Sequence, residues 1–430
     1  MLHLSFKYTT MIKTISLLII CLTFVSNSFA KVDYVRVMFN HNGSNQATIG
    51  WHQQSGDNQT VYYGTKDNTP SNYKAYAFSQ IPNVSNSFKG MKNNFVRLQS
   101  LLPNTAYYFV IVDSEGQSER YWFKTTSNDS NQKLSLIGGG DSRSRRTQRQ
   151  MGFLMAGKLN PHAILFDGDF TSSDIEAKWK LWFEDWKLTY KDFDNKVIPI
   201  VTARGNHELT NKDLVNFFDC PSKKNYYNVT LGGDLINLIQ LNTEISIRAQ
   251  NHFLKRTLDQ HKNYYWQLPQ YHRACRPHIK WKLRHHIPKS IYKSWIELFE
   301  KAGVKAVLEC DSHITKTTFP IVKSTNKEDG GFDRDDENGI VYVGEGCWGA
   351  PLRTPDVRWT WTQSADKVDS FKWFIIDQNK MEIRTVAYMN ADSIVGLTDK
   401  NKFDIPKNIS LWPNNQEVIE IYNSPNCPQK

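Results

Sequence analysis

The chain has 430 residues, of which 40% are hydrophobic and 13% aromatic, so it can bury a sizeable core and is not an intrinsically disordered protein. Its formal net charge of +10 favours anionic partners such as phosphate esters, although a basic surface that only keeps the protein soluble explains the charge as well. The six cysteines include no CxxC pair, which argues against a thiolate zinc site.

The first thirty residues have the pattern of a secretory signal peptide. Lys13 supplies a positive charge before the apolar stretch from Ile15 to Val25, and Ser28-Phe29-Ala30 forms a small-x-small cleavage site. We therefore expect residues 1–30 to be removed by cleavage near Ala30 and the protein to be secreted or periplasmic. The apolar stretch is too short for a membrane span, so we expect no span in the mature chain.

An exported compartment permits disulfides between the cysteines that follow residue 30. Their number is odd, so one thiol must stay unpaired within the chain, and their pairing cannot be deduced from the sequence. These cysteines are Cys220, Cys275, Cys310, Cys347 and Cys427.

Residues 31–128 are predicted to form a small all-β sandwich domain. Alternating apolar and polar residues at 33–39, 46–51 and 60–63 are separated by Asn, Gly and Ser, which is typical of short strands. The segment 99–112 places a Pro-Asn turn before an aromatic strand. The polar stretch from Thr125 to Gln132 is the expected linker.

Strands and helices alternate beyond the linker, which predicts an α/β domain with outer helices over residues 131–395. Helices are expected at 147–159 and at 175–190, where an aromatic stripe at helical spacing indicates core packing. Strands are expected from residue 163 and at 197–201, 235–241, 264–270 and 304–308, before a return to β structure at 339–389. Residues 396–430 form a C-terminal extension.

Residues of metal-ligand type directly follow five of the apolar runs. In chain order these residues are Asp141, Asp169, Asn206 with His207, His272, and Asp311 with His313. Because ligands bind at the carboxyl ends of strands in open α/β sheets, we expect these side chains to meet at one edge. Carboxylate, carboxamide and imidazole groups gathered there predict a metal site, and two ions rather than one. Gly168 and Gly205 are expected to let the backbone turn tightly toward the ions.

These segments resemble the ordered motif blocks of the binuclear metallophosphoesterases, whose fold is a four-layer α/β/β/α sandwich. The blocks are Gly140-Asp141, Gly168-Asp169, Gly205-Asn206-His207-Glu208, Tyr271-His272-Arg273 and Asp311-Ser312-His313. The preceding domain is similar to the fibronectin type III-like domain of purple acid phosphatases. Segments 61–65, 102–108 and 121–125 carry that similarity, and the block at 344–351 also fits the family.

The resemblance implies a role for each residue of the series. Asp141, Asp169 and His313 would hold the first ion, and Asp169, Asn206, His272 and Asp311 the second. His207 would lie beside the ions and protonate the leaving alkoxide or stabilise the transition state. The implied reaction is attack of a metal-bound hydroxide on a phosphate ester.

Two positions depart from the family pattern. Ser172 stands where purple acid phosphatases have the tyrosine that gives them their colour, so we expect no tyrosinate charge transfer, and Zn, Mn, Fe and Mg all remain candidates. Asp311 stands where the family has a histidine. A carboxylate there favours oxygen-loving metals if it is a ligand, and otherwise the second site is weakened.

Positively charged residues near the series are candidates for substrate binding. Arg143 follows Asp141 by two positions and would clamp a phosphate, or else it belongs to a basic surface run with Arg145, Arg146 and Arg149. His278 would reach substrate or support a ligand, or else it is a plain loop histidine. The basic run from Lys280 to Lys289 is either a phosphate-attracting lid or a solvated surface.

The sequence therefore predicts an exported phosphatase that hydrolyses phosphate monoesters of small molecules or phosphoproteins at two divalent or trivalent ions. The alternatives are a phosphodiesterase or nucleotidase on the same fold, and a binding protein with a weakened metal site. We expect no specific nucleic-acid binding, and the oligomeric state is open.

Overall fold

A computed structural model describes residues 29–413 and 418–423. The predicted signal segment, apart from Phe29 and Ala30, lies outside these ranges, as does Cys427. Within them, no helix has both the length and the apolar character that a membrane crossing requires. Cys220, Cys275, Cys310 and Cys347 are buried and form no disulfide within the described chain.

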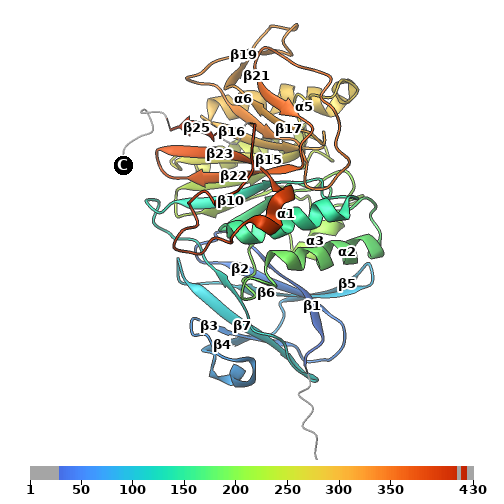
Figure 1. Ribbon diagram of the computed structural model, residues 1–430, viewed down its shortest axis with the longest axis vertical. Coiled ribbons are helices and arrows are strands. Elements are labelled where there is room, and N and C mark those ends of the chain that lie inside the picture. The colour runs from blue at the N-terminus through green and yellow to red at the C-terminus, as the bar shows by residue number, and fades with distance from the viewer. Residues whose placement is uncertain (1–28, 414–417, 424–430) are drawn as a thin grey trace, which may run out of the picture.

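Two large sheets form the body of the molecule (Figure 1). The first runs in the order β24 (Leu411–Trp412), β23 (Lys380–Ala387), β22 (Ser370–Ile376), β10 (Leu134–Gly139), β11 (Ala163–Phe166), β12 (Ile200–Thr202), β1 (Val32–Met38), β2 (Ala47–Gln53), β6 (Met91–Leu98) and β5 (Val84–Phe88), with β25 (Val418–Tyr422) beside β23. The second runs β13 (Tyr227–Leu231), β14 (Ile236–Gln240), β15 (Trp266–Arg273), β16 (Ala306–Cys310), β20 (Val341–Gly344), β17 (Thr315–Thr318) and β21 (Thr362–Asp366).

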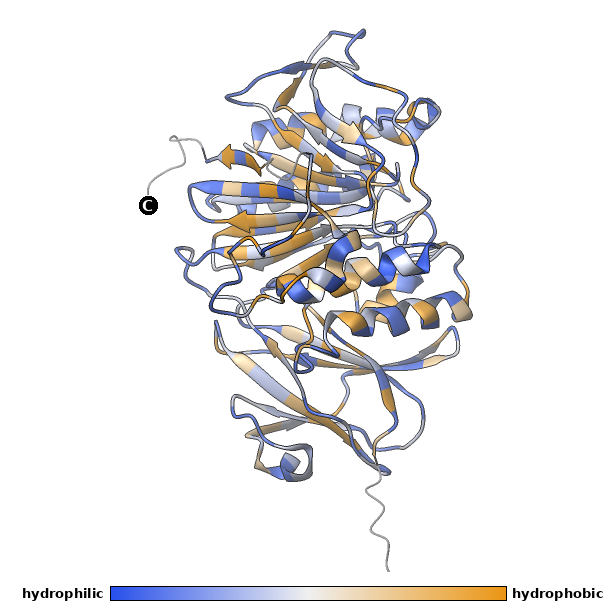
Figure 2. Ribbon diagram, in the orientation of Figure 1, coloured by the Kyte–Doolittle hydropathy of each residue, from blue (hydrophilic) through white to orange (hydrophobic). Residues whose placement is uncertain are grey.

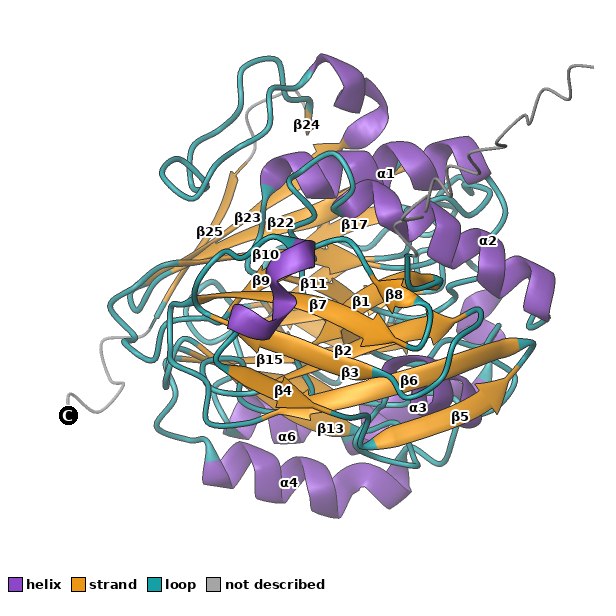
Figure 3. Cartoon of the chain, turned by 90° about the horizontal axis from the view of Figure 1, so that it is seen from below, coloured by secondary structure: helices purple, strands orange, loops and turns teal. Residues whose placement is uncertain are grey.

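Helices cover the outer faces of both sheets, as predicted. They are α1 (Arg146–Leu159), α2 (Glu176–Trp186), α3 (Lys212–Phe218), α4 (Asn251–Gln260), α5 (His286–Ser294) and α6 (Ile296–Lys301). Phe153 of α1 and Trp182 of α2 pack on Phe166 of β11, whereas α4, α5 and α6 share a buried cluster with β14, β15 and β16. Figure 3 shows α1 and α2 on one side of the strands and α4 and α6 on the opposite side. The α/β/β/α sandwich is confirmed.

The N-terminal all-β domain is also confirmed. A third sheet, of β4 (Phe78–Gln80), β3 (Thr60–Gly64), β7 (Ala106–Asp113), β8 (Gly116–Gln117) and β9 (Tyr121–Lys124), packs on β1, β2 and β6. The buried residues between them include Val37, Trp51, Phe95, Phe109 and Phe123. A small hairpin of β18 (Ile321–Lys323) and β19 (Phe332–Arg334) completes the strands of the described chain.

The individual elements follow the predicted periodicities closely. The aromatic stripe of α2, with Trp179, Trp182, Phe183 and Trp186, is fully buried, which confirms that it is core. Figure 2 shows the same amphipathic pattern, with orange and blue segments alternating along α1 and α2. Several bounds differ from the expected ones: α2 ends at Trp186 rather than at 190, β12 begins at Ile200 rather than at 197, and β15 continues to Arg273 rather than ending before His272. In addition, β24 and β25 of the C-terminal segment join the first sheet at β23.

The N-terminal domain is joined to the α/β sandwich by more than the linker. Met38 of β1 pairs with Ile200 of β12, so the first sheet runs through both parts. Lys89, between β5 and β6, forms ion pairs with Asp174, on the loop after β11, and with Asp213, in the first turn of α3. Because Asp174 follows the turn of Asp169 and Asp213 follows the turn of Asn206 and His207, the N-terminal domain, which lies at the bottom of Figure 1, supports the site.

Candidate metal centre

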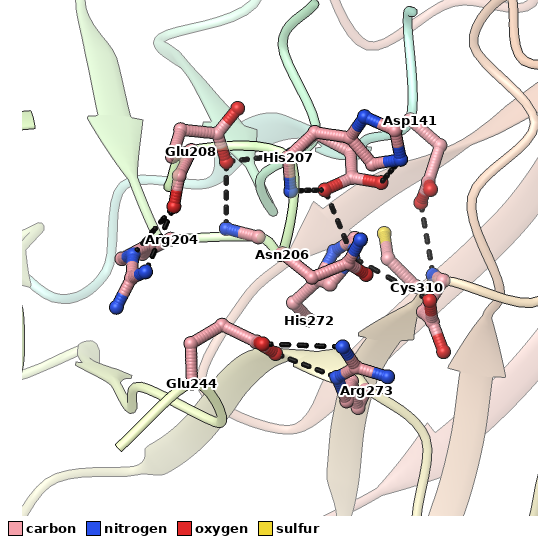
Figure 4. A network of polar contacts seen from close by, with 12 residues as sticks. Asp141, Arg204, Asn206, His207, Glu208, Glu244, His272, Arg273 and Cys310 are labelled. Atoms are coloured by element: carbon pink, nitrogen blue, oxygen red, sulfur yellow. Dashed lines mark hydrogen bonds and ion pairs between the residues drawn. The ribbon is translucent and has the colours of Figure 1, made fainter. Parts of the chain in front are cut away.

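The predicted ligands gather where parallel strands of the two sheets end. β10, β11 and β12 are parallel neighbours, and Asp141, Asp169 and Asn206 lie in the turns that follow them. β15 and β16 are parallel neighbours in the other sheet, and they supply His272 and the Asp311–His313 turn. Figure 4 shows side chains from both sheets converging on one point.

The distances within this group separate it into two overlapping sets. His313 Nε2 lies 3.1 Å from Asp141 Oδ1. His272 Nε2 lies 3.3 Å from Asp169 Oδ1, 3.2 Å from Asn206 Oδ1 and 3.7 Å from Asp311 Oδ1. Asp141, Asp169 and His272 bring one ligand atom each within 4.8 Å of one another, and all three are buried. The two sets are joined at Asp141 and Asp169.

Backbone carbonyls fix the orientation of both imidazoles. Nδ1 of His272 donates to the carbonyl of Asp167 over 2.8 Å, and Nδ1 of His313 donates to the carbonyl of Pro351 over 3.0 Å. A carbonyl only accepts, so in the neutral ring Nδ1 carries the proton and Nε2 presents its lone pair. Hydrogen bonds from the other ring nitrogen to a carbonyl hold metal-ligating histidines in place.

The Nε2 lone pair of His313 faces Asp141 Oδ1, and that of His272 faces Asp169 Oδ1, which also accepts a hydrogen bond from the amide of His207. Asp141 Oδ1 and Asp169 Oδ2 are buried and make no hydrogen bond. Lone pairs and carboxylate oxygens at such separations repel one another unless a cation lies between them. Ligands that each lie about 2.1 Å from one ion are about 3.0–3.4 Å apart, which fits most of these distances. The residues present therefore fit a metal cluster.

The pKa values in the cluster point the same way. Burial lowers the pKa of His272, but the carboxylates of Asp169, Asp141 and Asp311 outweigh it and hold that pKa well above its usual range. Burial likewise raises the pKa of Asp169, but the two nearby histidines outweigh it and hold the pKa below its usual range. The cluster thus attracts positive charge at its centre, as a metal site does.

Four of the predicted ligands have left-handed backbone conformations. The φ angles are +59° at Asp141, +54° at Asp169, +75° at Asp311 and +57° at His313. Such conformations cost about 1–3 kcal/mol each when they are strained and persist where the surrounding structure imposes them, typically at functional sites. His272 is instead positioned by a β-bulge. The pairing of β15 with β16 shifts register between Tyr271 and Arg273, so His272 lies at the irregularity.

Gly168 and Gly205 allow two turns to pack against each other. A Cβ on Gly168, whose φ is +85°, would lie 2.2 Å from the amide nitrogen of Gly205, and one on Gly205 would lie 2.3 Å from that of Asp169. The tight turn expected at Gly168 is present. Gly205 has no left-handed backbone, so its contribution is space for the neighbouring turn rather than the turn itself.

Glu208 is a functional position to which the sequence reasoning gave no role. Its buried carboxylate accepts hydrogen bonds from the amides of Asp169, Phe170 and Gly205, at 2.8–2.9 Å. Burial and the charge of Asp169 raise the pKa of Glu208, whereas these amides favour its charged form. Glu208 therefore holds the two turns together, and its place three residues after Gly205 was the available signal.

His207 lies beside the cluster and is partly exposed. Its Nδ1 donates to the carbonyl of Ser172 over 2.9 Å, and its Nε2 is 3.8 Å from Asp169 Oδ2. Its amide donates to Asp169 Oδ1 over 2.7 Å. The ring therefore turns Nε2 toward the cluster without entering the ligand sets.

Arg143 also reaches the cluster, unlike its basic neighbours. Its Nη1 lies 3.1 Å from His313 Nε2, and its buried Nε has no hydrogen-bond partner. Arg145 pairs with Asp369, and Arg146 and Arg149 both pair with Asp185. The run thus divides into three structural arginines and one that faces the site.

His278 is fully buried and is occupied elsewhere. Its Nε2 lies 2.8 Å from Thr362 Oγ1, its Nδ1 lies 3.8 Å from Glu345 Oε1, and its ring packs edge-on against Trp359 and Trp361. None of these contacts, within the described part of the chain, is with a member of the cluster. The geometry does not support a substrate-binding role for this histidine.

Lys282 is the second position that the sequence reasoning did not single out. Its Nζ lies 2.6 Å from Asp311 Oδ2, and it is buried, whereas most of the run from Lys280 to Lys289 is exposed. The sequence predicts a lid or a solvated surface for the whole run, so only the fold reveals this contact.

Comparisons with known proteins agree with this architecture. Residues 32–125 match the family model described as the purple acid phosphatase N-terminal domain, and residues 137–309 match that of the calcineurin-like phosphoesterases. Among solved structures, the purple acid phosphatase PPD1 from yellow lupin (Lupinus luteus) seeds aligns with a TM-score of 0.68 at 15% identity, over 84% of this chain and 72% of that one. PhoD aligns with a TM-score of 0.62 at 10% identity, over 85% and 88%. No curated protein matches the chain.

Proposed function

We propose that this chain, which belongs to the calcineurin-like metallophosphoesterases and carries a purple acid phosphatase N-terminal domain, is an exported phosphatase that hydrolyses phosphate monoesters. The observation that supports this most strongly is the pair of buried imidazoles, His272 and His313, whose Nε2 atoms face carboxylate oxygens. Carbonyls hold both rings in the tautomer that a metal needs.

The ligand sets that we propose are those that the resemblance to the metallophosphoesterases implies, and the short distances from His313 and His272 support most of their members. Asp141, Asp169 and His313 would hold one ion, and Asp169, Asn206, His272 and Asp311 the other. Two ions bound there would supply Lewis-acid polarisation of the phosphoryl group and would lower the pKa of a water molecule to about 7. Zn, Mn, Fe and Mg all suit these oxygen and nitrogen ligands, and Ser172 provides no tyrosinate that would favour iron.

His207 is the proposed general acid. The bond from its Nδ1 to Ser172 leaves Nε2 as the atom that can deliver a proton to the leaving alkoxide. The partial exposure of the ring places it where an ester oxygen can approach from solvent. Its position outside the ligand sets lets it move a proton without disturbing them.

Arg143 is the proposed clamp for the phosphate. Its guanidinium has no carboxylate partner among the described residues, so its charge is available to an anionic substrate. Its Nη1 contacts His313 Nε2 and its Nε has no hydrogen-bond partner, so the guanidinium lies beside the cluster with a donor still available for a phosphate oxygen.

The proposal is tested by comparing p-nitrophenyl phosphate with bis(p-nitrophenyl) phosphate as substrates of the metal-loaded protein. We expect the monoester to be cleaved with the higher kcat/KM. Faster cleavage of the diester would favour the phosphodiesterase or nucleotidase alternative. A protein that binds no metal and cleaves neither ester would favour the binding-protein alternative.

Export is a separate part of the proposal. Sequencing the N-terminus of the protein recovered from the secreted or periplasmic fraction should identify a start just after Ala30. Recovery of the full-length chain from the cell interior alone would contradict it.

A further inference from the structure

Asp311 connects two different parts of the structure through its two oxygens. Oδ1 faces the ligand cluster, 3.7 Å from His272 Nε2, and Oδ2 lies 2.6 Å from Nζ of Lys282. Both side chains are buried, with Asp311 and Lys282 each 6% exposed. The carboxylate is therefore oriented from outside the cluster by an ammonium group.

Lys282 is held in place by its own backbone. Its amide donates to the carbonyl of Ile279 over 3.0 Å, and its carbonyl accepts from the amide of His285 over 3.1 Å. The neighbouring Lys280, Arg284 and Lys289 are exposed. Lys282 thus differs from the other cations of the run in being directed inward.

A second cation supports the same turn through its backbone. Arg353 Nη1 donates to the carbonyls of Asp311 and Ser312 over 3.1 and 3.2 Å, and its amide donates to the carbonyl of His313 over 2.9 Å. Arg353 fixes the main chain of the turn, so the contact with Lys282 is left to set the Asp311 side chain. The two cations have separable tasks.

The contact between Lys282 and Asp311 matters because it changes the net charge of the cluster. Asp311 stands where the family pattern has a histidine, and a carboxylate in place of a neutral imidazole adds one negative charge beside Asp141 and Asp169. Buried charges are tolerated when they are paired and hydrogen-bonded. The ammonium of Lys282 supplies one positive charge in direct contact, so the pair as a whole carries the net charge of the imidazole that it replaces.

We propose that Lys282 and Asp311 act as one unit at the second metal position, with Lys282 as the positioning residue that aims Oδ1 at the ion and cancels the added charge. The inference rests on the proposed function, because it presumes that the cluster binds two ions. It predicts that a substitution at either residue affects the second ion more than the first, because Asp141 and His313 of the first set do not touch Lys282 among the described contacts.

The experiment measures the affinity of the full-length protein for Zn²⁺ and, separately, Mn²⁺, by competition with a chelating indicator. In Lys282→Met we expect the weaker of two binding steps to lose about 10–100-fold in affinity while the tighter step is retained. Lys280→Met removes an exposed cation from the same run and is the matched control, with both affinities unchanged. Retention of the first ion in Lys282→Met shows that the variant is folded.

The double variant Asp311→His with Lys282→Met gives the sharpest test. It should regain most of the lost affinity, whereas Asp311→His alone should bind the second ion more weakly than the double variant, because it keeps a buried ammonium without its carboxylate. Equal affinities in the single and double variants would overturn the coupling of the two residues.

Four further outcomes would also overturn the inference. If Lys282→Met gains a second ion that the wild type lacks, the ammonium takes the place of the metal. If Lys282→Met raises KM for p-nitrophenyl phosphate and leaves metal affinity unchanged, Lys282 is a substrate-binding residue. A wild type that binds two ions, with Lys282→Met unchanged, defeats the inference alone, whereas a wild type that binds none defeats the proposed function as well.

Discussion

Nδ1 of His207 donates a hydrogen bond to the carbonyl oxygen of Ser172 over 2.9 Å. The two residues lie on the loops after β12 and β11, so the contact orients the imidazole across two adjacent turns. It leaves Nε2 directed toward the cluster, 3.8 Å from Asp169 Oδ2. The position of this one nitrogen determines what His207 can do in a phosphoryl transfer.

His207→Gln should lower kcat according to how much the leaving group needs a proton. We expect a loss of about 10²–10⁴-fold for an alkyl phosphate, whose alkoxide is a poor leaving group, and a much smaller loss for p-nitrophenyl phosphate. Steady-state kinetics with both esters, together with metal analysis, checks this. An equal loss for both esters, or a loss of bound metal, would show that His207 has another role.

Asp169→Asn should remove more metal than any other single ligand substitution. Asp169 belongs to both proposed ligand sets, and one of its oxygens is buried without a hydrogen bond. Metal analysis of the purified protein should find two ions in the wild type and at most one in the variant. Asp194→Asn is the matched control, because Asp194 also has a left-handed backbone, with φ of +55°, but lies on the surface. A variant that retains both ions would contradict the bridging role.

Arg143→Met should raise KM for p-nitrophenyl phosphate by about 10-fold or more, because it removes a charge-assisted contact with the phosphate. Arg146→Met is the comparison, since Arg146 is in the same run but pairs with Asp185. We expect its KM to stay at the wild-type value. Similar kinetic changes in the two variants would mean that the basic run affects substrate binding only through the combined electrostatic field of its positive charges.

Lys89→Met tests whether the N-terminal domain supports the catalytic loops. The substitution would leave Asp213, whose side chain is fully buried, and Asp174 without their shared cation. We expect a loss of stability of about 3 kcal/mol in chemical denaturation and a lower kcat, because Asp174 and Asp213 accept hydrogen bonds from the amides of Leu209 and Thr210, just after His207. Lys124→Met, which removes a surface pair with Asp399, should cost at most about 1 kcal/mol and leave kcat alone. Equal changes in stability and in kcat for Lys89→Met and Lys124→Met would contradict the specific role of Lys89 in supporting the catalytic segments.

Asp399→Asn should change the pH dependence of stability. Burial raises the pKa of Asp399, but Lys196 and Lys402 outweigh it and hold the pKa well below its usual range. The folded pKa is lower than the unfolded value of about 3.9, so the contribution is present above that pH and is lost as the pH falls below it. Wild type should exceed the variant by about 1 kcal/mol at pH 7, with the difference shrinking toward pH 3. A constant difference across this range in denaturation experiments would contradict the assignment.

Much of the site was accessible from the order of residues. The turns after β10, β11, β12 and β16 carry Asp141, Asp169, Asn206 and Asp311 because ligand-type residues follow apolar strands, and strand direction brings them together. The helical spacing of Trp179, Trp182 and Trp186 likewise predicted a buried face. These features are local in sequence, so periodicity and turn chemistry are enough to find them.

The tertiary structure decided which side chains complete the site. The carbonyls of Asp167 and Pro351 select the tautomers of His272 and His313 from 105 and 38 residues away along the chain, and Lys282 reaches Asp311 from 29 residues away. His278 and Lys282 look alike in sequence, as polar residues on one loop, yet one is occupied by Thr362 and the other faces the metal ligands. The sequence by itself therefore determined the types and order of the ligands, whereas the packing of two sheets decided their partners, because contacts between distant segments depend on register and burial that no local pattern encodes.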